Sequence, residues 1–219
     1  MRFVFPLLLG LAGCAVLIGL GLWQVQRLEW KTAILADIDS RIGAAPVAVP
    51  AAPDPVEDRF LPVRASGEIA GPGLRVLTSP EGLSAGYRRI VPFETDGRRL
   101  LLDAGWVPLD DPAPLEGAAL ELVGNLHWPD ETDSFTPAPE GDLWFVRDVA
   151  AMAEALDTEP VLIVLREPDR DLGTVPLPLD SAGIANDHLE YAITWFLLAL
   201  VWAGMTGYLI VRTMRRREG

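Results

Sequence analysis

Residues 186–196 read Asn-Asp-His-Leu-Glu-Tyr-Ala-Ile-Thr-Trp-Phe, and they lead directly into a long apolar segment. His188 in this stretch is one of only two histidines among the 219 residues. From Tyr191 to Val211 no residue carries a charge, and a helix of about 20 such residues crosses the hydrocarbon core of a bilayer. The stretch therefore predicts a transmembrane helix over residues 189–211, with a histidine where the helix begins.

A second uncharged run covers residues 3–23 and predicts a second transmembrane helix. The tail at residues 212–219 contains four arginines, and such basic flanks stay in the cytoplasm. Two spans then place both termini in the cytoplasm and the intervening segment outside. The short N-terminus before the first run does not resemble an organelle transit peptide. We therefore predict a multi-pass protein of the bacterial inner membrane with a large periplasmic domain.

One local motif offers an alternative for the first span. Leu11-Ala-Gly-Cys14 resembles the cleavage box of a bacterial lipoprotein. The apolar run continues for nine residues beyond Cys14, whereas the apolar core of a signal peptide ends near its cleavage site. We therefore interpret Cys14 as a small thiol within a membrane helix.

The composition excludes several functions. The net charge is −13, and 30 of the 31 acidic residues lie between residues 24 and 190. This segment is too acidic to attract nucleic acid or anionic lipid, which bind to positively charged surfaces. Cys14 is the only cysteine, which rules out an intramolecular disulfide, a Cys-x-x-Cys redox pair and a thiolate metal cage. No Gly-x-Ser-x-Gly, phosphate-binding glycine loop or His-Glu-x-x-His motif supports an enzyme.

The helical pattern of the first span continues beyond the membrane surface. Trp23, Arg27, Trp30 and Ile34 recur at helical spacing, which predicts a helical stalk over residues 24–43. An alternative interpretation assigns the two tryptophans to the aromatic belt of the membrane surface. Residues 44–59 are rich in proline and alanine and are typical of a semi-extended linker.

Residues 60–180 read mainly as short strands bounded by glycine and proline. The clearest pair covers residues 87–95 and 98–107, joined by Asp96-Gly97, the preferred sequence of a type I′ hairpin turn. Asp148 is expected to cap a short helix over residues 149–156. The predicted fold is a membrane protein in which two transmembrane α-helices flank a mainly antiparallel β (α+β) extracytoplasmic domain, barrel- or sandwich-like.

The two histidines lie in different surroundings. His127, at the end of a predicted strand, is interpreted as a surface or hydrogen-bonded structural residue. His188 falls in the first turn of the second membrane helix, where Asp187 and Glu190 form a start that resembles a capping box. The positive end of the helix dipole disfavours imidazolium there, so we expect a neutral ring, the form that binds metal.

Tyr191 and Trp195 follow His188 at three and seven residues, which places the three side chains on one helix face. A capped helix with aromatic side chains at the membrane surface explains the same pattern without any ligand. From the residues alone, this simpler interpretation is at least as well supported as a binding site.

The predicted topology brings the two spans together at one depth. The first span ends at Trp23 and Gln24 on the side of the membrane where the second span begins. A flat, apolar, metal-bearing ligand with an anionic edge would fit such a place, its carboxylates directed towards Arg27 or Lys31. Haem has that shape, and histidine is its commonest axial ligand.

Three blocks of sequence carry a resemblance to a known family. They are residues 20–31 (Leu-Gly-Leu-Trp-Gln-Val-Gln-Arg-Leu-Glu-Trp-Lys), 101–108 (Leu-Leu-Asp-Ala-Gly-Trp-Val-Pro) and 188–196 (His-Leu-Glu-Tyr-Ala-Ile-Thr-Trp-Phe). With the two spans and residues 144–148 (Trp-Phe-Val-Arg-Asp), they resemble the Surfeit locus protein family of cytochrome c oxidase assembly factors. Two residues depart from the family pattern, since Ala104 stands where arginine is usual and Glu190 where glutamine is common.

The resemblance implies a non-enzymatic membrane protein that binds haem a as cargo and helps to insert it into subunit I of the oxidase. It also implies contact with a haem a synthase and with the lipid bilayer. The histidine of the third block is the suspected axial iron ligand, which assigns that role to His188. The other candidate haem-binding residues are Trp23, Gln24, Arg27, Tyr191 and Trp195.

A second hypothesis remains open at this point. The protein could be a cofactor-free membrane scaffold that stabilises an oxidase assembly intermediate through its two helices and its acidic outer domain. We do not expect a two-span sensor, because only about eight residues follow the second span and a signalling domain needs many more.

Overall fold

The computed structural model describes residues 4–110, 115, 117–182 and 184–215. The chain divides into two compact units. A helical unit contains Met1–Asp37 and Ser181–Gly219, and a barrel unit contains Ile38–Asp180.

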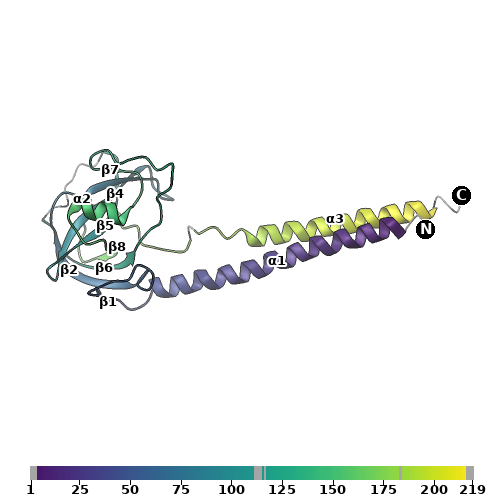
Figure 1. Cartoon of the computed structure of the whole chain (residues 1–219), viewed down its shortest axis with the longest axis horizontal. Helices are drawn as coiled ribbons and strands as arrows, with labels where there is room; N and C mark the ends of the chain where they lie inside the picture. Colours follow the sequence, from purple (N-terminus) through teal and green to yellow (C-terminus); the bar gives the residue numbers. More distant parts are fainter. Residues whose placement is uncertain (1–3, 111–114, 116, 183, 216–219) are drawn as a thin grey trace. The chain divides into compact units, whose positions relative to one another are not determined.

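The helical unit is formed by α1 (Val4–Ile42), as far as Asp37, and by α3 (His188–Arg215). Both helices are long and apolar enough to cross a membrane, and few of their residues are buried within the protein. Figure 1 shows the two helices side by side and antiparallel. Their large apolar side chains therefore face outwards, as a bilayer requires and water would not tolerate. Part of the predicted tail, residues 216–219, lies outside the described residues.

The barrel unit contains eight strands and one short helix among the described residues. The strands are β1 (Val47–Ala48), β2 (Pro62–Ile69), β3 (Leu74–Thr78), β4 (Gly86–Thr95), β5 (Arg98–Pro108), β6 (Ala119–His127), β7 (Leu143–Trp144) and β8 (Leu162–Pro168). The helix is α2 (Val149–Leu156). Strand β1 was not predicted, because it lies within the expected linker.

Five of the strands close into a barrel. Strands β2, β6, β8, β5 and β4 pair in that order, and β4 pairs again with β2 through Glu68 opposite Glu94 and Ile69 opposite Phe93. Every junction is antiparallel except that between β5 and β8. The predicted fold class is therefore confirmed. Of the two predicted alternatives, the domain is a barrel and not a sandwich.

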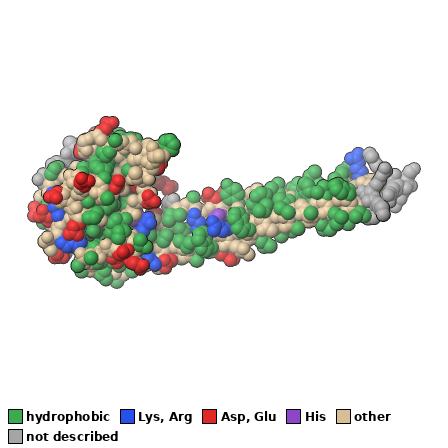
Figure 2. All heavy atoms as spheres, viewed as in Figure 1, with side chains coloured by type: hydrophobic (Ala, Val, Ile, Leu, Met, Phe, Trp, Pro, Cys, Tyr) green, Lys and Arg blue, Asp and Glu red, His purple; other side chains and the backbone are tan. Residues whose placement is uncertain are grey.

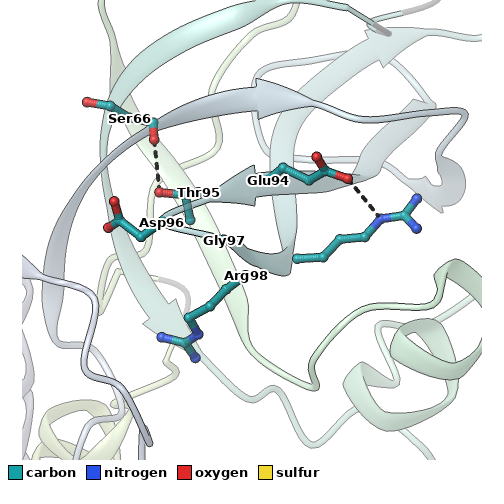
Figure 3. A pocket seen from close by; sticks show the side chains of 7 residues that line it. Ser66, Glu94, Thr95, Asp96, Gly97 and Arg98 are labelled. Atoms are coloured by element: carbon teal, nitrogen blue, oxygen red, sulfur yellow. Dashed lines mark hydrogen bonds and ion pairs between the residues drawn. The ribbon is translucent and has the colours of Figure 1, made fainter.

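The closing junction depends on a residue without a side chain. A Cβ atom at Gly67 would lie 2.0 Å from the Glu94 carbonyl oxygen, so only glycine lets β2 approach β4 this closely. The Thr95 hydroxyl donates a hydrogen bond to the Ser66 carbonyl at 2.9 Å across the same junction (Figure 3). These contacts close the five strands into a barrel, while β1 and β7 remain at the two ends of the eight-stranded sheet.

The predicted hairpin forms the neighbouring junction. Asp96 and Gly97 both have positive φ, at 50° and 74°, as a type I′ turn requires. The turn joins β4 to β5, and the pairing from Thr95 opposite Arg98 extends along both strands. The hairpin prediction is confirmed.

Two hydrophobic clusters lie on opposite faces of the barrel wall. Leu100, Leu102 and Ile163 point into the barrel, while Leu101 and Leu162 point outwards under α2. Strands β5 and β8 are thus buried on both faces, which explains their continuous apolar sequence. The Asp148 carboxylate accepts a hydrogen bond from the Ala151 N–H at 3.0 Å, which confirms the predicted cap of α2.

The last turn of α1 belongs to the barrel unit and is capped by it. The Ile42 carbonyl accepts hydrogen bonds from the Asn125 amide at 3.0 Å and from the Arg166 guanidinium at 2.8 Å. Carbonyls at a helix C-terminus have no partner within the helix, so these two donors satisfy one of them from the barrel wall. Asn125 also donates to the Phe60 carbonyl at 2.9 Å and thereby holds the chain on both sides of the linker.

His127 is buried beside a network of charges. Its side chain is 7% exposed and stacks on the Phe60 ring, with 5.5 Å between the ring centroids. Burial, together with the positive charges of Arg147 and Arg59, lowers its pKa to about 4. Of the two alternatives, the surface position is therefore wrong. His127 lies opposite Leu162 on the outer face of the barrel wall, where neighbouring residues such as Phe60 bury it.

The barrel should lose stability in mild acid because of His127. Between its ordinary pKa near 6.5 and its folded value of about 4, the unfolded chain binds a proton that the folded protein excludes. The free energy of unfolding should therefore fall as the pH drops through this window, by up to about 3 kcal/mol. Urea unfolding of the full chain in lipid nanodiscs, followed by tryptophan fluorescence, measures this slope. In His127→Phe, which keeps a ring against Phe60, the slope should flatten, and equal slopes would contradict the assignment.

Candidate functional site on the helix hairpin

Helices α1 and α3 pack closely because small residues line their contact. A Cβ atom added at any of three α1 glycines would lie between 2.2 and 2.6 Å from a side chain of α3. The three contacts pair Gly10 with Thr206, Gly13 with Trp202 and Gly21 with Phe196. The Trp202 indole N–H donates to the Gly10 carbonyl at 3.1 Å. Close packing of small residues and hydrogen bonds between helices are the forces that hold helices together in lipid.

His188 is the first residue of α3, and it is joined to α1 by a hydrogen bond. Its Nδ1 atom lies 2.8 Å from the Gln24 Oε1 atom. Gln24 is 8% exposed and His188 is half-buried, so the contact is largely shielded. The helix begins where the Tyr191 N–H donates to the Asp187 carbonyl at 3.2 Å, which places Asp187 at the predicted capping position.

The hydrogen bond determines which nitrogen of His188 is available to a ligand. An amide oxygen only accepts, so Nδ1 carries the ring proton in this arrangement. In the neutral ring the lone pair then resides on Nε2. Ligating histidines in metalloproteins are commonly fixed in this manner, by a hydrogen bond from the nitrogen that does not bind the metal.

The contact between Gln24 and His188 also fixes how the two helices are rotated. Successive residues turn by about 100° in each helix, and the sense reverses between antiparallel partners. This geometry places Trp23, Arg27, Tyr191 and Trp195 on one side of the hairpin, flanking the Gln24–His188 pair. We call it the aromatic side. Gly21 and Phe196 lie on the opposite side, and their close contact agrees with this rotation.

The side chains on the aromatic side are available to a ligand. Trp23 is 51% exposed and Tyr191 56% exposed, while Trp195 is half-buried. The Arg27 guanidinium lies 4.5 Å from the centroid of the Trp30 ring, a cation–π contact that leaves its charge at the surface. Figure 2 shows Lys and Arg side chains gathered midway along the helical unit, beside a long apolar surface.

His188 alone could bind a metal ion that already has most of its ligands from a cofactor. Within the described residues no group of three or more His, Cys, Asp or Glu side chains could enclose a bare ion. A single oriented imidazole beside exposed aromatic rings and a guanidinium fits a haem, whose iron needs only axial ligands from the protein. The candidate residues are therefore of the kinds that a haem site needs.

Some residues of this site were not identified from the sequence. The contact glycines Gly10, Gly13 and Gly21 carried no signal, because glycine is common in any membrane helix. The hydrogen bond between Gln24 and His188 joins residues that are 164 positions apart, and no local pattern predicts it. The nearest available signal was the shared depth of Gln24 and His188 at the ends of the two spans.

These features define a two-helix membrane protein that carries a closed β-barrel and a histidine held at one end of the helix hairpin. The model of the SURF1 family matches residues 11–200. The chain is 30% identical to Surfeit locus protein 1 of Rattus norvegicus over 234 residues, covering 93% of this chain and 74% of the relative. A SURF1-like protein of Rickettsia bellii is 29% identical over 203 residues, covering 84% and 82%. The chain belongs to the SURF1 family, and the resemblance found in the sequence is confirmed.

The protonation of His188 at Nδ1 can be measured directly. The chain has only two histidines, so the side-chain nitrogen signals of 15N-histidine protein in nanodiscs are assigned by comparison with His127→Phe. The His188 spectrum should show the Nδ1–H tautomer and a lone pair on Nε2. In Gln24→Leu, which removes the acceptor, the ring should shift towards the Nε2–H form that predominates in water. An unchanged tautomer in Gln24→Leu would contradict the role assigned to this hydrogen bond.

Proposed function

We propose that the protein is an assembly factor for haem-copper cytochrome c oxidase, which binds haem a at His188 and delivers it to subunit I. The observation that carries this proposal is the hydrogen bond from His188 Nδ1 to Gln24 Oε1, which places the lone pair of the ring on Nε2. Membership of the SURF1 family, together with the resemblance of residues 20–31 and 188–196 to its assembly factors, supports the same function.

His188 would be the axial ligand of the iron, and haem a would be cargo rather than a permanent cofactor. A transfer protein needs a site that holds its cargo without enclosing it. The site meets this condition, since Gln24 is buried and orients the ring while Trp23 and Tyr191 remain exposed.

The remaining candidate residues would contact the macrocycle. Trp23, Tyr191 and Trp195 offer aromatic surfaces on the aromatic side of the hairpin, beside His188. Arg27 carries a positive charge at the surface and would bind a propionate, a group that a guanidinium recognises through paired hydrogen bonds. In this proposal the protein orients and protects its cargo and catalyses no reaction.

The proposed location follows from the two apolar helices and the basic residues at the end of α3, where Arg212 and Arg215 lie in the last turn. Both termini would lie in the cytoplasm of a bacterium, with the barrel in the periplasm. Subunit I and a haem a synthase are the proposed partners, since the cargo must come from one membrane protein and pass to another. The family match to a Rickettsia protein supports a bacterial setting.

The alternative function, a scaffold without cofactor, is supported by the charge of the barrel unit. Acidic side chains gather on its surface in Figure 2, and the chain as a whole carries a net charge of −13. Such a surface could hold a basic region of an assembly intermediate. A scaffold would not need the His188 imidazole, and this difference separates the two functions.

Replacing His188 should abolish haem binding without unfolding the protein. We expect His188→Ala, purified from cells that synthesise haem a, to lose the Soret band and to yield an oxidase depleted in haem a. Gln24→Leu keeps the ligand but frees the ring, so its haem affinity should fall by about 10–100-fold. The control is His127→Phe, which changes the other histidine and should keep its haem. Full haem content in His188→Ala would overturn the ligand assignment, and normal oxidase assembly in that variant would favour the scaffold.

A further inference from the structure

Two apolar grooves run along the hairpin at the level of Gly10 and Thr206, which line both of them. The first groove is also lined by Leu9, Met205 and Leu209 and has a volume of about 120 Å³. The second is lined by Leu11, Cys14 and Ala203, among others, and has a volume of about 230 Å³.

Helical periodicity assigns the first groove to the aromatic side of the hairpin. Leu9 lies 18 residues before Arg27, and Leu209 lies 18 residues after Tyr191. Eighteen residues make five complete helical turns, so each pair shares one face of its helix. Trp202 likewise follows Trp195 by seven residues, about two turns. The first groove thus continues the surface on which the cargo of His188 would lie.

The second groove lies on the opposite side. Cys14 precedes Gly21 by seven residues and shares its face of α1. Gly21 contacts Phe196 on the side away from Trp23 and Tyr191. Both grooves are apolar and lie at the level of Gly10, the second being the larger, and only the first lies on the side of the proposed site.

The distance between His188 and the first groove matches a particular chemical group. Gly10 lies 14 residues from Gln24, or about 21 Å along the helix, well inside a hydrocarbon core of roughly 30 Å. A farnesyl chain extended from the edge of a porphyrin covers a span on the order of 20 Å, or about four helical turns. The groove volume of about 120 Å³ approaches that of a cavity of about 150 Å³ that binds benzene, which has six carbons, so the groove suits the five carbons of one isoprene unit and not a whole farnesyl chain.

We infer that this groove binds the end of the isoprenoid tail of haem a, and that the hairpin thereby selects tailed haems over haem b. The inference rests on the proposed function, because the tail can reach the groove only from a haem that is bound at His188. The tail would lie along the aromatic side past Trp195, and its last isoprene unit would fill the groove between Leu9 and Met205. Burial of an apolar chain against apolar side chains supplies the affinity, and the length of the chain supplies the selectivity.

Haem o and haem b separate the contribution of the tail from that of the iron ligand. The two differ only at one ring position, where haem o carries the hydroxyethylfarnesyl group and haem b a vinyl group. We expect the full-length protein in nanodiscs to bind haem o at least about tenfold more tightly than haem b in a spectroscopic titration. Leu9→Trp or Met205→Phe, each of which fills the groove, should bring this ratio close to one without changing the affinity for haem b.

Leu11→Trp is the matched control, since it adds the same bulk to the second groove and should leave the ratio unchanged. Equal affinities of the wild-type protein for haem o and haem b would overturn the inference while leaving His188 as the ligand. A ratio that survives both groove-filling variants would also overturn it, and would indicate that lipid occupies the groove instead. Failure of the wild-type protein to bind either haem would overturn the proposed function together with the inference.

Discussion

The hydrogen bond between Gln24 and His188 is the constraint on which the candidate site depends. It connects the two apolar helices at one end of their contact and determines both the orientation of the imidazole and its protonated nitrogen. In a lipid environment a polar side chain has few other partners, so two such groups brought to the same depth are expected to pair. One contact thus stabilises the hairpin and leaves the lone pair of the ring on Nε2.

The hydrogen bond in turn requires the close approach of the helices. Gly10, Gly13 and Gly21 allow it, because a side chain at any of them would collide with α3. The same packing leaves a side of the hairpin on which Trp23 and Tyr191 are exposed. The barrel unit uses glycine in the same manner, since Gly67 permits the contact between β2 and β4 that closes the barrel. In both units, contacts between distant parts of the chain depend on positions without side chains.

Features determined by local sequence could be predicted. The two apolar helices followed from composition, the β4–β5 hairpin from Asp96-Gly97, and the cap of α2 from Asp148. Closure of the barrel could not be predicted, because it depends on two residue pairs between β2 and β4 that no periodicity marks. The burial of His127 was missed for a similar reason, since the direction of a side chain at a strand end depends on register. At the candidate site, the sequence indicated the residues and the structure supplied the contact that orients one of them.

Binding of the haem iron by Nε2 of His188 can be measured directly. Pulsed electron paramagnetic resonance of the ferric haem-loaded protein, prepared with 15N-histidine, measures the coupling of the iron to an axial imidazole nitrogen. The expected result is a strong 15N coupling in the wild-type protein and in His127→Phe, and its absence in His188→Ala supplied with the same haem. A coupling that persists in His188→Ala, or that disappears in His127→Phe alone, would contradict this assignment.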